Sequence, residues 1–290
     1  MTTDPLGVRL RVAIANMFWR VCPSIRGKRR IWDLIVPREG WFPTTIGIRM
    51  RLAPWDYTSR RLILGSRGND LVADFARSTP EGSCFLDIGS NRGPYASLAG
   101  RAVGSGGTII AVEPNPKLWK LLLANLEEHV QGRYMLVPMA IADHAGWMGF
   151  LVDSKRHTGG GHLTAEARDG IESKLVAAQT ASAVLNPFIS EDVPELRIKI
   201  DTEGAEFLVL KGIESLLRRS NCRAVLVELT EEHLARFNSA ESEIYDYMNG
   251  FGFKPRISME QAAKRKDEDG YYDQWFEKPG SECGFREFLA

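Results

Sequence analysis

The stretch FLDIGSNRGPYASLAG, residues 85–100, changes within a few positions from an apolar run to a glycine-containing turn and then to a helical pattern. Its first four residues are typical of a buried strand. Gly89 and Gly93 let the backbone turn tightly and approach a ligand, and Pro94 suits the first position of a helix. A strand, a glycine turn and a helix in this order predict an α/β unit that binds a ligand at the carboxyl end of its strand.

The same order of strand, turn and helix recurs along the chain. Apolar runs predict strands at residues 84–89, 108–113, 134–141, 196–201 and 224–228. Helical patterns follow at residues 94–103, 117–130, 205–218 and 240–249. This alternation predicts a Rossmann-like, doubly wound and mostly parallel sheet. The segments FGFKPRI (251–257) and YYDQWFEKP (271–279) predict a late antiparallel pair, and RHTGGGHLT (156–164) predicts a glycine-rich loop.

The beginning of the chain does not follow this pattern. WFPTTIGIRMRLAP (41–54) alternates and is rich in β-branched residues, so it predicts a strand pair, and a helix is expected near residues 70–78. We therefore divide the chain into an N-terminal region, residues 1–79, packed on the core, and an α/β domain, residues 80–290.

Residues 1–32 are both basic and amphipathic. They hold seven arginine or lysine residues and one acid, Asp4. Apolar residues recur there at helical spacing, namely Leu6, Leu10, Ile14, Met17, Phe18 and Val21. The interpretation that we favour is a helix that packs its apolar face on the domain and leaves its arginines in water. The alternative is a basic helix that lies on an anionic membrane.

The overall composition argues against several classes of protein. The 290 residues carry 37 basic and 37 acidic side chains, so no net field attracts nucleic acid. The four cysteines lie far apart and form no C-x-x-C pair, which argues against zinc sites and disulfides. The sequence lacks an apolar run of membrane-spanning length and a signal-peptide h-region. It therefore predicts a cytoplasmic protein, with peripheral contact to the inner membrane face through residues 1–32 as an option.

Two carboxylates distinguish between the cofactors that the glycine turn could bind. Asp87 lies two residues before Gly89, and Glu113 ends the second strand, where a carboxylate can hold a ribose. The G-x-x-x-G spacing differs from the G-x-G-x-x-G of dinucleotide sites, and Asp87 would repel a pyrophosphate. Asp87 would instead attract an ammonium group, which S-adenosylmethionine (SAM) carries. The two acids therefore favour SAM over NAD.

Five segments also carry a family resemblance: FLDIGSNRG (85–93), IIAVEPNP (109–116), MAIADHAG (139–146), IKIDTEGAEFLVLKG (198–212) and VLVEL (225–229). Over residues 80 to 230 the chain resembles the FkbM-type SAM-dependent methyltransferases, with Arg92, Pro94 and Thr202 as departures. The resemblance implies a Rossmann-like methyltransferase domain over residues 80–290. It further implies O-methylation, with transfer to a hydroxyl of a sugar-containing metabolite, glycolipid or natural product. Arg92 is expected to alter the cofactor turn or to contact the substrate.

The resemblance and the polar residues at strand ends give a set of candidate site residues. The cofactor is expected to contact Asp87, Gly89, Ser90, Asn91, Gly93, Glu113, Pro114, Asn115, Ala140, Ile141 and Asp201. The candidate catalytic residues are Asp201, Glu203, Glu228 and His144. Asp201 is the first candidate for the base or the anchor of the acceptor hydroxyl. The competing explanation is that it caps the helix that follows.

Other polar residues near these positions have simpler explanations. Glu206 lies inside a predicted helix and is expected to be structural or solvated. Lys199 lies in a buried strand and is expected to extend to the surface or to pair with an acid. His157 and His162 flank three glycines and are either lid residues or exposed loop residues.

Three further possibilities concern metals, nucleic acids and the loss of catalysis. Asp201, Glu203, Glu228 and His144 could converge on a hard cation, but no two-histidine spacing supports this, and we predict no metal. Methylation of nucleic acid is disfavoured, because the fourth strand ends in IDTEG and not in the Asn/Asp-Pro-Pro-aromatic run of base-amine methyltransferases. The alternatives that stay open are a non-catalytic SAM-binding or scaffold protein and an amine or carboxyl acceptor.

Overall fold

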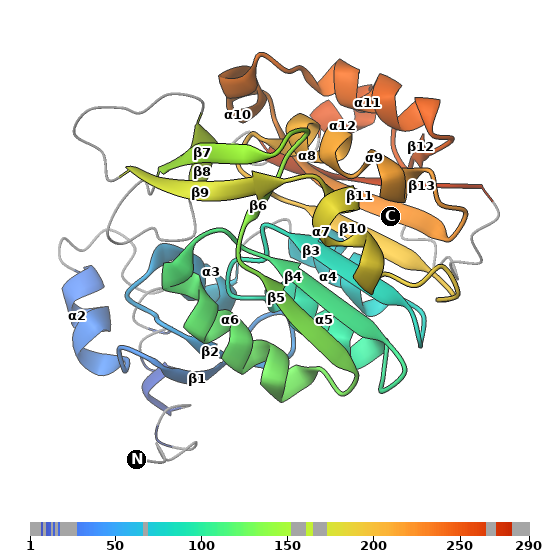
Figure 1. Cartoon of the computed structure of the whole chain (residues 1–290). Helices are drawn as coiled ribbons and strands as arrows, with labels where there is room; N and C mark the ends of the chain where they lie inside the picture. Colours follow the sequence, from blue (N-terminus) through green and yellow to red (C-terminus); the bar gives the residue numbers. More distant parts are fainter. Residues whose placement is uncertain are drawn as a thin grey trace.

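A seven-stranded sheet forms the centre of the computed structural model, which describes residues 7, 10–12, 14, 17, 28–65, 69–151, 161–164, 173–264 and 271–279. Its strands follow the order β12-β13-β11-β10-β3-β4-β5 (Figure 1). The parallel strands are β3 (Cys84–Ile88), β4 (Thr108–Val112), β5 (Arg133–Val137), β10 (Leu196–Ile200) and β11 (Cys222–Thr230). At one edge, β13 (Tyr271–Glu277) pairs antiparallel with β11 and with β12 (Lys254–Pro255). The prediction of a mostly parallel sheet with late antiparallel strands is confirmed.

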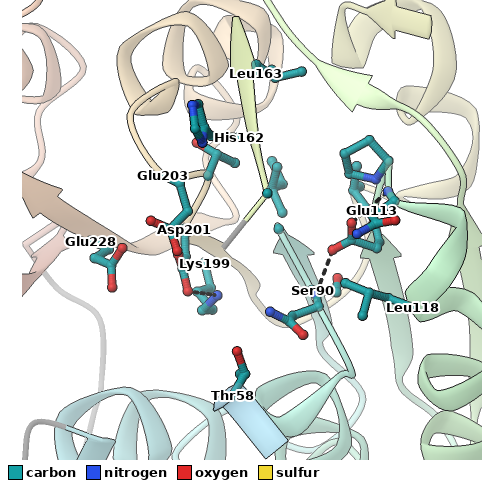
Figure 2. Close-up of a pocket in the computed structure, with 18 of the residues that line it drawn as sticks. Thr58, Ser90, Glu113, Leu118, His162, Leu163, Lys199, Asp201, Glu203 and Glu228 are labelled. Carbon is teal, nitrogen blue, oxygen red and sulfur yellow. Dashed lines mark hydrogen bonds and ion pairs between the residues drawn. The ribbon is translucent and has the colours of Figure 1, made fainter. Parts of the chain in front are cut away.

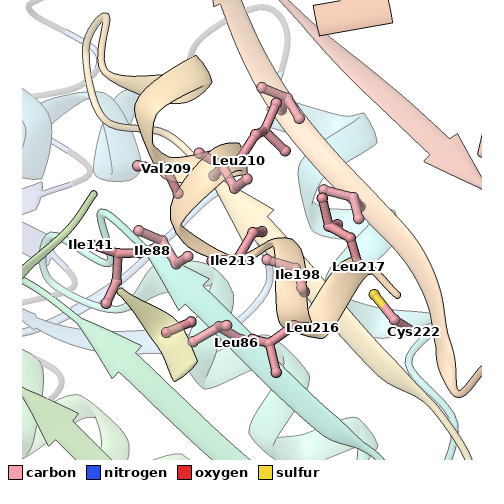
Figure 3. Close-up of a cluster of buried hydrophobic side chains, with 14 of the residues drawn as sticks. Leu86, Ile88, Ile141, Ile198, Val209, Leu210, Ile213, Leu216, Leu217 and Cys222 are labelled. Atoms are coloured by element: carbon pink, nitrogen blue, oxygen red, sulfur yellow. The ribbon is translucent and has the colours of Figure 1, made fainter. Parts of the chain in front are cut away.

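Helices cover both faces of this sheet. One face packs against α5 (Pro94–Ala102) and α6 (Pro116–His129), and the other against α8 (Glu206–Gly212), α9 (Glu214–Leu217) and α11 (Glu241–Gly250). Successive residues of a strand point to opposite faces, so Phe85 belongs to the first core and Leu86 to the second. Figure 3 shows part of the second core, where Leu86 and Ile198 lie near Leu216 of α9. Burial on both faces explains the continuous apolar runs in the sequence.

Short elements complete the described part of the chain. They are α7 (Ala181–Val184), η1 (Asn186–Phe188), α10 (Glu231–Leu234), η2 (Ala235–Phe237) and α12 (Met259–Ala263). The single helix predicted at residues 205–218 is divided into α8 and α9 after Gly212, where a Cβ atom would lie 2.2 Å from the carbonyl oxygen of Ala142. None of the described helices has both the length and the apolar character of a membrane span.

The N-terminal region shares a hydrophobic core with the sheet. It contains α2 (Lys28–Ile35), β1 (Gly40–Pro43), β2 (Arg49–Leu52), α3 (Tyr57–Leu64) and α4 (Asn69–Arg77). The predicted strand pair is β1 with β2, and the predicted helix near residues 70–78 is α4, whereas α3 was not predicted. Trp32, Phe42 and Met50 are buried in one cluster with Phe85 and Trp275.

A helical segment before α2 turns its apolar side chains in an unexpected direction. Val12 is buried in the core, while Leu10, Ile14 and Met17 are exposed. Residues spaced by three and four lie on one face of a helix, and Val12 is on the opposite face. The favoured prediction, an apolar face packed on the domain, is therefore wrong for these three residues.

Within the described residues, a second sheet has the strand order β6-β9-β7-β8 (Figure 1). Its strands are β6 (Ala140–Ile141), β7 (Gly146–Leu151), β8 (His162–Thr164) and β9 (Ser173–Gln179). The strand predicted at residues 134–141 is interrupted at Pro138, which has no N–H group for the ladder, and β6 then pairs with β9. The segment predicted as a glycine-rich loop ends in β8, so this prediction is wrong for residues 162–164.

A buried ion pair joins the N-terminal region to the glycine turn. Arg92 Nη2 lies 2.8 Å from Asp56 Oδ1, and both side chains are almost completely shielded from solvent. The Asp56 carboxylate also accepts hydrogen bonds from the N–H groups of Thr58 and Ser59 and so caps α3. Arg92 therefore connects the glycine turn to the N-terminal region.

Replacing Arg92 by methionine is expected to lower the free energy of unfolding by about 3–5 kcal/mol, because the Asp56 carboxylate stays buried without its charged partner. Unfolding in urea measures this loss. Arg218→Met is the matched control: it removes an exposed pair with Glu214 and should change the free energy by at most about 0.5 kcal/mol. A loss below about 1 kcal/mol for Arg92→Met would contradict the structural role of the pair.

Candidate active site

A cavity of about 620 Å³ opens at the carboxyl ends of the parallel strands (Figure 2). Residues at the ends of β3, β4, β10 and β11 line it, together with residues of α3, β6, β8 and β13. The strand order reverses direction between β3 and β10. Ligands of doubly wound sheets bind at this edge and at such a reversal, so the cavity is the candidate active site.

The glycine turn after β3 forms one wall of the cavity. Gly89, Ser90 and Asn91 line it, and the N–H groups of Gly89 and Ser90 both donate to the carbonyl oxygen of Val112. Gly89 has a φ of 80°, and a Cβ atom there would lie 1.7 Å from the carbonyl oxygen of Asp201. A residue with a side chain would therefore push the ends of β3 and β10 apart.

Gly93 and Arg92 belong to the turn but do not line the cavity. A Cβ atom on Gly93 would lie 2.6 Å from Cδ1 of Leu122, so this glycine lets α5 approach α6. The expectation of a direct cofactor contact is replaced by a packing role. Because Arg92 faces Asp56, the expectation of a substrate contact is not supported either.

Glu113 marks one end of the cavity. Its two carboxylate oxygens accept hydrogen bonds from the N–H groups of Asn91 and Asn115, each at 2.8 Å. Burial raises the pKa of Glu113 to about 7, although these two hydrogen bonds and Arg92 act in the opposite direction. Pro114, Asn115, Ala140 and Ile141 line the cavity as well. The structure thus brings together most of the residues predicted to bind the cofactor.

This end of the cavity fits the nucleoside part of SAM. A carboxylate oxygen has two lone pairs, and each oxygen of Glu113 has one backbone N–H donor, so both can still accept a hydrogen bond from a ribose hydroxyl. Ile141 and Leu118 supply apolar surface beside it, as small-molecule sites usually do. The lining residues therefore suit an uncharged, hydroxyl-bearing nucleoside.

Asp87 does not contact the cavity, which corrects the prediction of a ligand contact. Its side chain is fully buried, and its charged partner is Lys199, whose Nζ lies 3.4 Å from Oδ1. Lys199 Nζ also donates to Asp201 Oδ2 at 3.1 Å. Burial acts to lower the pKa of Lys199, but Asp201 and Asp87 outweigh it and raise the pKa. The ammonium group that Asp87 attracts thus belongs to the protein itself.

Carboxyl groups gather at the other end of the cavity (Figure 2). Asp201 follows β10, Glu228 lies in β11, and Asp273 is opposite Glu228 in β13. Burial, followed by the charges of Asp201 and Glu203, raises the pKa of Glu228 well above its ordinary value. Three strand spacings separate Glu113 from Glu228, or roughly 14 Å at about 4.8 Å per strand. The cavity therefore has two distinct ends.

The structure argues against a capping role for Asp201. Helix α8 begins at Glu206, and its N-cap residue, Ala205, makes no side-chain cap. The Glu206 carboxylate instead accepts hydrogen bonds from the N–H groups of Thr202 and Gly204 and from the Thr202 hydroxyl. Glu206 is thus buried and structural, as expected, and Asp201 is free of the helix.

Two of the histidines singled out from the sequence can be placed in the structure, and they lie in different surroundings. His144 does not line the cavity: its side chain is 57% exposed and its Nδ1 lies 2.7 Å from Asp143 Oδ1. The prediction that His144 lies at a strand end beside the site is wrong, because the chain leaves the central sheet at Pro138. His162 lines the cavity from β8, and His157 lies outside the described residues.

Several lining residues were missed from the sequence. They are Tyr57, Thr58 and Arg61 of α3, Tyr95 of α5, His233 and Arg236 after β11, and Tyr271 and Asp273 of β13. His233 Nδ1 lies 3.4 Å from Glu203 Oε2 at the cavity wall, and burial lowers the pKa of His233, which favours its neutral form. The cap residue Asp56 before an apolar helical pattern could have predicted α3. No local sequence pattern indicated that β13 would supply residues to the cavity.

Across the part of the chain that the structure describes, no group of three or more histidine, cysteine, aspartate or glutamate side chains is arranged to hold a metal ion.

Comparison with known proteins identifies one family model that matches the chain. The model of the methyltransferase FkbM domain matches residues 87–255. No curated protein sequence matches.

Several solved structures are similar at low sequence identity. An rRNA methylase of Streptococcus thermophilus is 10% identical, with a TM-score of 0.43, and the match covers 73% of this chain and 97% of that one. A SAM-dependent O-methyltransferase of Thermotoga maritima is 13% identical, with a TM-score of 0.41 and coverages of 87% and 81%. M. capricolum TrmK, in complex with S-adenosylhomocysteine, is 11% identical, with a TM-score of 0.39 and coverages of 72% and 68%.

The affinity for S-adenosylhomocysteine is expected to weaken as the pH falls below 7. Protonation of Glu113, whose pKa is about 7, removes an acceptor for the ribose hydroxyls, so binding at pH 6 should be about tenfold weaker than at pH 8. Calorimetry at both pH values measures the ratio. Glu113→Gln should bind weakly with little pH dependence, while the exposed control Glu127→Gln should behave as the wild type. An equal pH dependence in Glu113→Gln would rule out this residue as the source.

Proposed function

The chain belongs to the methyltransferase FkbM domain family, and from this premise we propose that it transfers the methyl group of SAM to a hydroxyl oxygen of a sugar-containing acceptor. SAM-dependent methyl transfer follows from the family. The nature of the acceptor and the roles of individual residues are our proposal, and they rest on the carboxyl groups at the end of the cavity opposite Glu113.

The residues at the Glu113 end would hold SAM, which supplies an electrophilic methyl group on its sulfonium. Glu113 would accept hydrogen bonds from the ribose, and Asn91 and Asn115 hold its carboxylate in place through their N–H groups. The glycine turn leaves room for the ligand beside Ser90. These contacts position the cofactor, and positioning alone supplies a large part of the rate in a displacement reaction.

The acidic end of the cavity favours a hydroxyl acceptor over the alternatives. Asp201, Glu228 and Asp273 can all accept a hydrogen bond from a hydroxyl group. They would repel a carboxylate acceptor, and they would keep an amine acceptor protonated and hence without a nucleophilic lone pair. Tyr57 and Tyr271 add rings with polar tips, which suit the mixed apolar and polar surface of a sugar.

Asp201 and Glu228 have different surroundings, from which we assign different roles. Asp201 is bound by the Lys199 ammonium group, which fixes its orientation. Glu228 has a raised pKa and, within the described residues, no basic partner. A raised pKa makes a carboxylate a stronger base. We therefore assign Glu228 as the group that accepts the proton of the acceptor hydroxyl as the oxygen attacks, and Asp201 as the group that orients that hydroxyl.

Glu228→Gln is expected to lower the turnover number by roughly 10²–10⁴, the usual contribution of a general base. Because glutamine has the same shape and no charge, S-adenosylhomocysteine affinity and melting temperature should stay at the wild-type values or rise. Transfer of labelled methyl from SAM to a panel of sugars and glycolipids measures turnover. The matched control is Glu203→Gln, which changes a carboxylate that lines the same cavity near His233 and should have a much smaller effect. Wild-type turnover in Glu228→Gln would contradict the assigned base.

Asp201→Asn should also reduce turnover, but it should leave the pH dependence of the reaction in place because Glu228 still titrates. Glu228→Gln should abolish the acidic limb of that profile. The two variants together separate the orienting role from the proton-accepting role. Labelled methyl on an amine or carboxyl group of the product, and not on a hydroxyl oxygen, would overturn the proposed acceptor class.

A further inference from the structure

Apolar side chains at the start of the chain face solvent although buried positions are close by. Leu10, Ile14 and Met17 are 63%, 44% and 62% exposed, while Val12 on the opposite face of the same helix is 4% exposed. Val12 thus attaches the helix to the core and leaves a stripe of large apolar side chains on the outside. Isolated exposed apolar residues are ordinary, but a stripe along one helical face indicates a partner.

Helix α2 repeats this arrangement. Trp32 and Val36 are buried in the core, whereas Leu34 is 85% exposed and Ile31 is 36% exposed. Trp55 is 38% exposed and lines a shallow depression together with Trp32 and Val36. Exposed apolar surface therefore extends from α2 to the segment that leads into α3, and α3 lines the active-site cavity.

Charge complementarity identifies the partner. Residues 1–32 hold seven basic side chains and one acid, although the whole chain has no net charge. Arg11, which follows Leu10, and Arg30, which precedes Ile31, are both exposed, and Asp33 of α2 is an exposed acid. A second copy of this chain would bring the same basic surface against itself, which is unfavourable. An anionic lipid surface provides both apolar depth and negative phosphates.

We propose that this N-terminal surface, defined by Leu10, Ile14, Met17, Ile31 and Leu34, binds to membranes that contain anionic lipids. The apolar side chains lie at the boundary between headgroups and acyl chains, and Arg11 and Arg30 lie near the phosphates. The binding is shallow and reversible, and it needs no membrane span. It would bring the cavity to a glycolipid acceptor at the membrane surface, but the docking surface itself does not depend on the proposed reaction.

Sedimentation of the full-length chain with vesicles tests the proposal. Binding is expected to vesicles of phosphatidylcholine with phosphatidylglycerol and not to phosphatidylcholine alone, and it should weaken as salt rises. The triple variant Leu10→Gln, Ile14→Gln, Met17→Gln should bind at least about tenfold more weakly. Arg11→Gln with Arg30→Gln should also lose roughly tenfold or more.

The matched control is Trp147→Gln with Leu175→Gln. These side chains are 72% and 71% exposed on β7 and β9, which lie apart from α2 in Figure 1, and their replacement should leave vesicle binding unchanged. All changed positions are exposed, so melting temperatures should match the wild type. Equal binding to neutral vesicles, unchanged binding of the triple variant, or a wild-type dimer that the triple variant converts to a monomer would each overturn the proposal.

Discussion

A buried ammonium group, that of Lys199, holds the carboxyl ends of β3 and β10 together. Its Nζ lies 3.4 Å from Asp87 Oδ1 and 3.1 Å from Asp201 Oδ2. Moving such ions out of water costs several kcal/mol for each, which only close and well-oriented pairing offsets. The two strands cannot slide past each other without leaving one of these charges unpaired. Because the same contact restricts the Asp201 carboxylate, the interaction that stabilises the edge of the sheet also orients a group in the candidate active site.

The backbone at this edge is fixed by contacts of a different kind. Gly89 approaches the carbonyl oxygen of Asp201 so closely that no side chain fits, and its N–H group donates to Val112. On the other side of the turn, Arg92 reaches Asp56 of the N-terminal region. The turn is thus held by β4, β10 and the start of α3 together. This explains how α3, which lies outside the strand-and-helix repeat, comes to form part of the cavity wall.

The sequence predicts those features that a local pattern determines. The apolar runs gave the parallel strands, and Glu113 at the end of β4 could be placed in the cavity from its position alone. Features that depend on distant partners were missed. Asp87 meets an ammonium group 112 positions further along the chain, so its partner was mistaken for a ligand. His144 was misplaced because Pro138 ends β5 and diverts the chain into the second sheet, whose strand β7 contains glycines that weaken its alternating pattern.

The end of the cavity that contains Asp201 and Glu228 is built from segments inside and outside the region that the family model matches. Asp201 and Glu228 lie inside the region that the family model matches, residues 87–255, whereas α3 and β13 lie outside it. The two outer elements are connected, since Arg61 Nη2 donates to the Tyr271 hydroxyl at 2.6 Å. In the reaction that we propose, an acceptor would place its hydroxyl against carboxyl groups of the matched region while the rest of its surface meets Tyr57 and Tyr271. Chemistry and acceptor fit would then depend on different segments, so substitutions in α3 or β13 would change the acceptor without disturbing the groups proposed to handle its proton.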